Sequence, residues 1–160
     1  MTENVRRWVD PISGYRCKAC LVEELGHWCG YAEVPPGHPL HGVDRNARMK
    51  PPPGWLDRAR PLQALSVMDL LLVHDGSVPL GLLLEVHGGV TFAGAHHDDT
   101  GWWFGFDCAH AGDLVPGLSR IPGAPQWIKD GVYRDIDYVT MECQHLAEQL
   151  HQLATRPARA

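Results

Sequence analysis

The most reactive side chains are gathered in the run WWFGFDCAHAGD, residues 102–113. Cys108 and His110 lie two positions apart, so a strand here would place both on one face, after two phenylalanines. Such a pair forms either a thiolate–imidazolium nucleophile or two ligands of a metal ion. Asp107 would face the other side of that strand, whereas Asp113 follows a glycine at the strand exit. We therefore expect Cys108, His110 and Asp113 to carry the chemistry.

A second group of candidates lies in the run HGGVT, which begins at His87. His87 ends a predicted apolar strand, so it can lie beside His110 at a neighbouring strand end, and we count it among the catalytic residues. The predicted metal ligands, for zinc or another divalent ion, are His87, Cys108 and His110. Gly88 and Gly89 let the backbone turn sharply and bring its amides close to an anionic ligand.

Aromatic side chains near these groups are suited to holding a planar ligand. Trp102 and Trp103 lead into the reactive run, and His38 lies in a proline-rich loop with an extended backbone. We predict that these three residues contact the ligand, with the tryptophans stacking on a base. The glycine spacings of phosphate loops and dinucleotide-binding folds are absent from the sequence. The alternative is that Cys108 is a core thiol and His110 only ends a strand.

The remaining cysteines are predicted to be structural. Cys17 and Cys20 have the spacing of a zinc motif, but on a strand their sulfur atoms point to opposite faces and cannot share an ion. Cys143 falls on the apolar stripe of the last predicted helix, where a buried free cysteine is usual. The odd total of five cysteines favours reduced thiols.

The elements that must position these residues are a few strands and one helix. Residues 15–34 predict a hairpin around EELG, and strands are also predicted before and after His87 and through 102–110. The last helix follows an aspartate cap at Asp135 or Asp137. Its apolar stripe consists of Val139, Cys143, Leu146, Leu150 and Leu153. The expected fold is α+β: a mostly antiparallel sheet with long Pro/Gly-rich loops, backed by a C-terminal amphipathic helix.

The chain is expected to form a single domain over residues 1–160. The variable loop 35–61 is rich in proline, and 111–134 is a second loop rich in glycine and proline. The segment 62–73 is apolar enough for a short helix or a buried strand, and its periodicity does not decide between them. A frayed basic tail is expected after about residue 154.

Charge and hydropathy exclude some functions. A formal net charge of -5 argues against non-specific nucleic-acid binding, which needs a clustered positive field. No apolar run approaches the roughly 18 residues of a membrane-spanning helix, and the first residues lack the apolar core of a secretion signal. We therefore expect a cytoplasmic protein without membrane contact, while the sequence leaves the oligomeric state open.

Four runs of the sequence resemble one protein family. HGGVT matches the pattern HGG[LV]T and GFDCAHAGD matches GFDCAHxGD, while GHWCGYAEVPPGHPLHG and YRDIDYVTMECQHLAEQL are similar to the family as well. The family comprises small uncharacterised proteins of bacteriophages, prophages and bacteria. The resemblance covers about residues 14–150, within which 45–80 is longer than expected. It implies a phage or mobile-element setting, where small proteins often counteract host defence signalling.

Three functions are compatible with these observations. The first is a hydrolase-like enzyme that acts on a small ligand, for which a nucleotide is one candidate. It would act through a Cys/His pair or a metal. The second is a non-catalytic protein that sequesters such a ligand in an aromatic and histidine pocket. The third is an interaction module whose polar cluster only satisfies a buried network. The hydrolase is the primary prediction, because four polar groups converge on the predicted strand ends.

Overall fold

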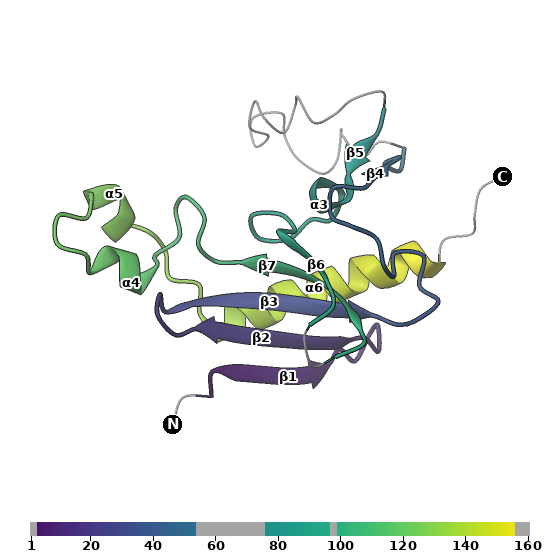
Figure 1. Ribbon diagram of the computed structural model, residues 1–160, viewed down its shortest axis with the longest axis horizontal. Coiled ribbons are helices and arrows are strands. Elements are labelled where there is room, and N and C mark those ends of the chain that lie inside the picture. The colour runs from purple at the N-terminus through teal and green to yellow at the C-terminus, as the bar shows by residue number, and fades with distance from the viewer. Residues whose placement is uncertain (1–2, 54–75, 97–98, 156–160) are drawn as a thin grey trace.

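The computed structural model describes residues 3–53, 76–96 and 99–155. Its strands are β1 (Val5–Val9), β2 (Arg16–Val22), β3 (His27–Val34), β6 (Phe92–Gly94) and β7 (Trp102–Asp107) in the main sheet. They are arranged in the order β1-β2-β3-β7-β6 (Figure 1). Every neighbouring pair is antiparallel. The prediction of an α+β fold with a mostly antiparallel sheet is confirmed.

The C-terminal helix α6 (Ile136–Thr155) covers one face of this sheet and packs on β2 and β3 (Figure 1). Its buried residues are Val139, Cys143, Leu146, Ala147 and Leu150. Four of these belong to the predicted apolar stripe. At the start of the helix, Asp135 Oδ1 accepts a hydrogen bond of 2.9 Å from the Tyr138 N–H, as an N-terminal cap does. Burial of the stripe against the sheet stabilises the helix.

Strand register sorts the side chains of the sheet into two faces. Cys17 is the direct neighbour of Ala32, and Cys20 is the direct neighbour of Cys29. Cys17 lies on the face that α6 covers, where its thiol contacts the Cys143 carbonyl oxygen at 3.9 Å. Cys20, three positions further along the strand, belongs to the opposite face. The two sulfur atoms therefore cannot share an ion, as the sequence predicts, and all five cysteines are free.

Two parts of the chain differ from the prediction. The sequence predicts a strand before His87, but Leu80–Leu83 forms one helical turn, α3, closed by the Leu84 N–H on the Leu80 carbonyl at 3.1 Å. The three leucines of α3 are buried, and a run buried all round has no period that separates helix from strand. The N-terminal segment, for which the sequence gives no strand signal, forms the edge strand β1.

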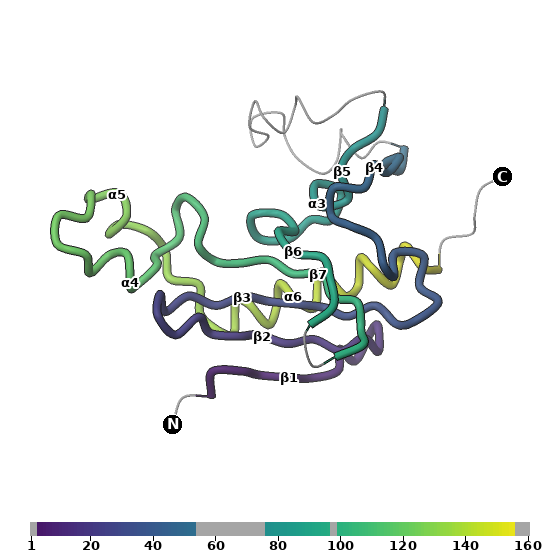
Figure 2. Tube along the Cα trace, viewed as in Figure 1, coloured from purple at the N-terminus to yellow at the C-terminus, as the bar shows by residue number. Residues whose placement is uncertain are grey.

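The segment between β7 and α6 leaves the sheet as a long loop (Figure 2). It contains two single-turn helices, α4 (Pro116–Ser119) and α5 (Gln126–Lys129). The loop is closed at its base by a parallel bridge between Asp113 and Val132. This closure brings the chain that enters α6 back beside the residues that follow β7.

The rest of the described chain forms a smaller unit. β4 (Arg48–Met49) and β5 (Val78–Pro79) pair as a separate two-stranded sheet. The predicted element at 62–73 lies outside the described residues. Among the described helices, none is long and apolar enough to cross a membrane.

Candidate functional site

Three polar side chains meet beyond the end of β7 that carries Asp107. His87, His110 and Asp113 each offer one ligand atom, and these atoms all lie within 4.8 Å of one another. We call these three residues the His–Asp cluster. The predicted closeness of His87 and His110 is confirmed, since their ring centroids are 5.7 Å apart. The cluster draws on the loop after α3 and on the loop after β7.

Asp113 is the centre of the cluster, and its side chain is 2% exposed. Its Oδ2 accepts from the His110 N–H at 3.0 Å and lies 2.7 Å from His87 Nε2, while its Oδ1 accepts from Arg134 Nε at 3.1 Å. Burial by itself raises the pKa of Asp113, but these hydrogen bonds outweigh burial and lower the pKa below its usual value. Asp113 is therefore a carboxylate at neutral pH.

The His87 ring is held from two sides. Because the Asp113 carboxylate can only accept, His87 Nε2 carries the proton of their 2.7 Å contact. On the other side, His87 Nδ1 lies 2.9 Å from the Tyr138 hydroxyl, and the His87 N–H donates to Glu142 Oε2 at 2.9 Å. Both of these partners lie on α6, so the helix fixes the position and orientation of the imidazole.

The His110 ring lies against Gly88. A Cβ atom at Gly88 would lie 2.3 Å from His110 Cε1, and Gly88 has a φ of 67°, so a glycine is required here for two reasons. His110 Nδ1 is buried without a hydrogen-bond partner among the described residues. It lies 3.5 Å from Asp107 Oδ1 and 3.9 Å from Asp113 Oδ2. These contacts are within ion-pair range but lack hydrogen-bond geometry, so the nitrogen can still bind a ligand.

Cys108 does not join the cluster. Its N–H donates to the Trp28 carbonyl at 3.0 Å, and its side chain is 2% exposed within the core. Burial, reinforced by the negative charge of Asp113, raises the pKa of Cys108 to about 12. A thiol with this pKa is not ionised at neutral pH, and thiolate is the reactive and metal-binding form. The structure therefore favours the core-thiol interpretation over the predicted nucleophile or metal ligand.

Asp107 lies closer to the cluster than strand alternation predicts. The sequence places it on the face opposite His110, but β7 ends at Asp107 and the chain then turns. The turn brings the His110 ring to 3.5 Å from Asp107 Oδ1. Asp107 is held there because Oδ2 accepts from the Thr91 hydroxyl at 3.0 Å and Oδ1 accepts from the Ala109 N–H at 3.1 Å.

The predicted ligand-binding residues are not brought together. The Gly89 N–H donates to the Val86 carbonyl at 2.8 Å, so it is not available to an anion, whereas Gly88 contacts His110 as described above. Trp102 packs on the core, with Nε1 donating to the Val43 carbonyl at 3.1 Å. Trp103 lies at the start of β7, at the opposite end of the strand from the cluster.

His38 lies in the protein interior, with partners on the proline-rich loop and on α6, and does not belong to the cluster. It is buried, its Nε2 donates to the Leu150 carbonyl at 2.8 Å, and its Nδ1 accepts from the Leu40 N–H at 3.0 Å. Burial lowers the pKa of His38, against the raising effect of the Leu150 hydrogen bond. Nε2 thus joins the proline-rich loop to α6, and Nδ1 forms a hydrogen bond within the loop itself.

Three residues of the site are missed by the sequence reasoning or left undecided by it. Tyr138 and Glu142 are four positions apart on α6, a spacing that puts both on one side of a helix and that could have marked them as a pair. Arg134, whose guanidinium lies 4.8 Å from the Tyr138 ring centroid, carries no local signal. It reaches Asp113 only because the long loop returns to the end of β7.

Comparison with known proteins assigns the chain to no family. No protein-family model matches it, and no curated protein or solved structure is significantly similar to it. The resemblance to phage and prophage proteins stays a prediction, and the geometry of the His–Asp cluster is the basis on which a function can be proposed.

Proposed function

We propose that the His–Asp cluster binds a divalent transition-metal ion, with zinc the best suited, and that the protein is a metal-dependent hydrolase of a small ligand. The observation that carries this proposal is the convergence of His87, His110 and Asp113, whose ligand atoms lie within 4.8 Å of one another. Imidazole nitrogens and a carboxylate oxygen are donors that zinc accepts readily. Three protein ligands also leave a coordination position open, as in catalytic zinc sites.

The hydrogen-bond inventory of the cluster supports the presence of an ion. His110 Nδ1 is buried and lacks a hydrogen-bond partner among the described residues. A buried polar atom without a partner destabilises the folded state, and native proteins rarely retain one without a reason. A metal ion at this nitrogen would remove the penalty and would also bind the adjacent Asp113 oxygen.

The outer contacts of the ligands also fit a metal site. Arg134 binds Asp113 Oδ1 at 3.1 Å, which orients the carboxylate and leaves Oδ2 facing the histidines. If His87 Nε2 binds the ion, His87 Nδ1 carries the proton and donates it to the Tyr138 hydroxyl 2.9 Å away. Histidine ligands of metals characteristically have such a partner on the second ring nitrogen, which fixes the ring and its tautomer.

Hydrolysis needs a water molecule to be activated and a proton to be accepted. A bound ion of this class supplies water activation and polarises the bond that is broken. Asp107 is the proposed proton acceptor, because its side chain is 32% exposed, lies next to His110 and is oriented by Thr91 and Ala109. Arg134 offsets the negative charge of Asp113 at the same place.

We propose a small substrate because the cluster is only partly open. The side chains of His87 and His110 are 12% and 31% exposed, which leaves room for one reactive group to approach. The resemblance to phage and prophage proteins adds nucleotide signals of host defence to the candidates. One assay panel therefore covers ester, phosphodiester and cyclic-dinucleotide substrates.

The experiment is an assay of metal-free protein to which Zn²⁺ or Mn²⁺ is added. The substrates are p-nitrophenyl acetate, bis-p-nitrophenyl phosphate and a cyclic dinucleotide. We expect ion-dependent hydrolysis of at least one of them. We expect this rate to fall by about 100-fold in His110→Ala, since loss even of an outer contact to a metal ligand lowers activity by about 10–100-fold.

The matched control is His41→Ala, which removes an exposed histidine whose ring lies 6.2 Å from that of Trp102, at the end of β7 opposite the cluster. This variant should hydrolyse the same substrate at the rate of the unmodified protein. Equal rates in His110→Ala and the unmodified protein, or a rate that does not depend on added ion, would contradict the proposal.

A further inference from the structure

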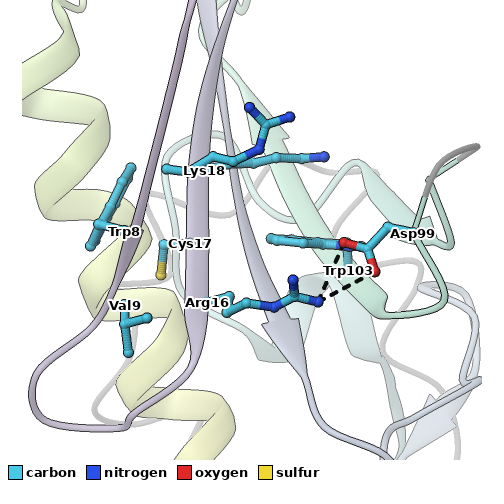
Figure 3. Close-up of a pocket in the computed structure, with 8 residues that line it drawn as sticks. Trp8, Val9, Arg16, Cys17, Lys18, Asp99 and Trp103 are labelled. Carbon is cyan, nitrogen blue, oxygen red and sulfur yellow. Dashed lines mark hydrogen bonds and ion pairs between the residues drawn. The ribbon is translucent and has the colours of Figure 1, made fainter.

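We propose that a pocket at the opposite end of β7 binds a small oxyanion, either a carboxylate or a phosphate group. The pocket has a volume of about 270 Å³, and the residues that bear on ligand chemistry are Arg7, Arg16, Lys18, Asp99 and Trp103 (Figure 3). They come from β1, β2, β7 and the loop before β7. This site is separate from the His–Asp cluster, and the proposal does not depend on the hydrolase.

Strand register gathers the cations of this pocket. Arg7 on β1 is the direct neighbour of Lys18 on β2, and Arg16 lies two positions before Lys18 on the same face. In Figure 3 the side chains of Arg16, Lys18, Asp99 and Trp103 lie on one side of β2, opposite Cys17. Cys17 faces α6, so the cations occupy the face of the sheet that this helix leaves uncovered.

Arg16 is already neutralised by carboxylates. Its guanidinium forms ion pairs with Glu33 and with Asp99, the latter at 3.3 Å. The same guanidinium lies 5.8 Å from the Trp103 ring centroid. These contacts fix Arg16 as one wall of the pocket. One guanidinium offsets only one of the two carboxylate charges, and the charge of Lys18, which also acts on Asp99, offsets the other.

Lys18 and Arg7 add positive charge to that wall. Lys18 is 6% exposed, with Nζ 2.8 Å from His96 Nδ1 and 4.6 Å from the Trp103 ring centroid. These contacts hold the ammonium in place. Arg7 is exposed and forms no ion pair or side-chain hydrogen bond with the described residues. Arg7 therefore supplies a guanidinium whose charge no described carboxylate matches, in a protein with a net charge of -5.

Trp103 gives a second, independent indication of a ligand. It is 3% exposed, and its Nε1 is buried without a hydrogen-bond partner among the described residues. An indole N–H can only donate, so the missing partner must be an acceptor. A guanidinium likewise only donates, and carboxylates and phosphates are the groups that it binds best. Trp103 thus needs an acceptor, and Arg7 favours one that is negatively charged; an oxyanion satisfies both.

The size of the pocket limits the ligand. A volume of about 270 Å³ is just below the roughly 300–1,000 Å³ that ligand sites usually have. The part of the ligand that the pocket holds is therefore a carboxylate or phosphate group with few further atoms.

The test is a titration of ¹⁵N-labelled protein followed by NMR, with inorganic phosphate in one arm and acetate in the other. Sodium chloride keeps the ionic strength constant, so that screening alone cannot produce a shift. We expect saturable shifts of the Trp103 indole signal and of the Arg16 and Lys18 amides in at least one arm. The arm that saturates at the lower concentration identifies phosphate or carboxylate as the preferred group.

Two neighbouring variants test which cation binds. Arg7→Gln removes the unmatched guanidinium and should weaken binding by about tenfold or more, because a charge-assisted hydrogen bond is lost. Arg6→Gln is the matched control: Arg6 is adjacent on β1, faces α6 and contacts Thr140, so its affinity should stay within about twofold of the unmodified protein. Absence of saturable shifts in both arms, or equal affinity in Arg7→Gln and Arg6→Gln, would overturn the proposal.

Discussion

The two ends of β7 hold their polar groups in different environments. Beyond Asp107, the Asp113 carboxylate is 2% exposed and is contacted from three directions by His87, His110 and Arg134. At the Trp103 end, the side chain of Arg16 is 55% exposed where it pairs with its carboxylates. A buried charge that loses its partners is strongly destabilising, whereas a solvated ion pair contributes little. One strand thus presents a buried network around a single carboxylate at one end and more exposed ion pairs at the other.

The largest expected effect is that of Asp113→Ala. The substitution leaves His87, Arg134 and the His110 N–H without their common acceptor, and it should lower the free energy of unfolding by about 3–5 kcal/mol. Urea denaturation followed by circular dichroism measures this loss. The matched control is Asp137→Ala, whose side chain is 89% exposed and lies 3.8 Å from Arg6; it should cost no more than about 1 kcal/mol. Similar losses in the two variants would show that the Asp113 network is not a stabilising unit.

The second effect separates the two roles of Gly88. Both Gly88 and Gly37 have positive φ, but a Cβ would clash with the His110 ring only at Gly88, while nothing lies within 4 Å at Gly37. Backbone strain predicts a loss of about 1 kcal/mol for Gly37→Ala. Gly88→Ala should lose about 2 kcal/mol more, because the His110 ring must move. Equal losses of unfolding free energy would mean that the ring contact with Gly88 does not contribute.

The third effect probes the exposed end of the strand. Arg16→Ala removes the ion pairs with Glu33 and Asp99. The arginine is 55% exposed but Glu33 is only 11% exposed, so the free energy of unfolding should fall by about 1–3 kcal/mol, less than in Asp113→Ala. Added salt should reduce the difference from the unmodified protein further. A loss as large as that of Asp113→Ala would remove the proposed contrast between the two ends.

The smallest effect concerns Cys108. Because burial raises the pKa of its thiol to about 12, only about one thiol in ten thousand is ionised at pH 8, and iodoacetamide should leave Cys108 unlabelled in the folded protein. Cys108→Ala should change the affinity for Zn²⁺ by less than about twofold. Peptide mass spectrometry and a zinc titration measure the two quantities. Rapid labelling of Cys108, or loss of zinc binding in Cys108→Ala, would restore the cysteine as a member of the site.

Much of the fold follows from patterns that the sequence displays locally. The hairpin of β2 and β3 is marked by two β-rich runs around a turn, so the opposite faces of Cys17 and Cys20 follow from a period of two along a strand. The stripe of α6 has a helical period and an aspartate cap at Asp135, so both the helix and its buried face can be predicted. The run before His87 has no such period, because its leucines are buried on all sides, and its helical turn could not be distinguished from a strand.

The site is less predictable than the fold because it depends on contacts between distant segments. His87 and His110 were accessible to the sequence reasoning as polar residues at expected strand ends. The pairing of Arg134 with Asp113 depends on closure of a long loop, which no local pattern encodes. Cys108 was predicted to lie beside His110 because a strand through 102–110 would place both on one face. Since β7 ends at Asp107, this alternation does not extend to His110.

Zinc binding by the His–Asp cluster is tested most directly by calorimetric titration of the metal-free protein with Zn²⁺. The predicted result is one ion bound per chain, with the affinity reduced by more than about tenfold in His110→Ala and unchanged in His41→Ala. Circular dichroism of each variant confirms that the fold is retained. Failure of the unmodified protein to bind zinc, or equal affinity in His110→Ala, would contradict a metal site formed by His87, His110 and Asp113.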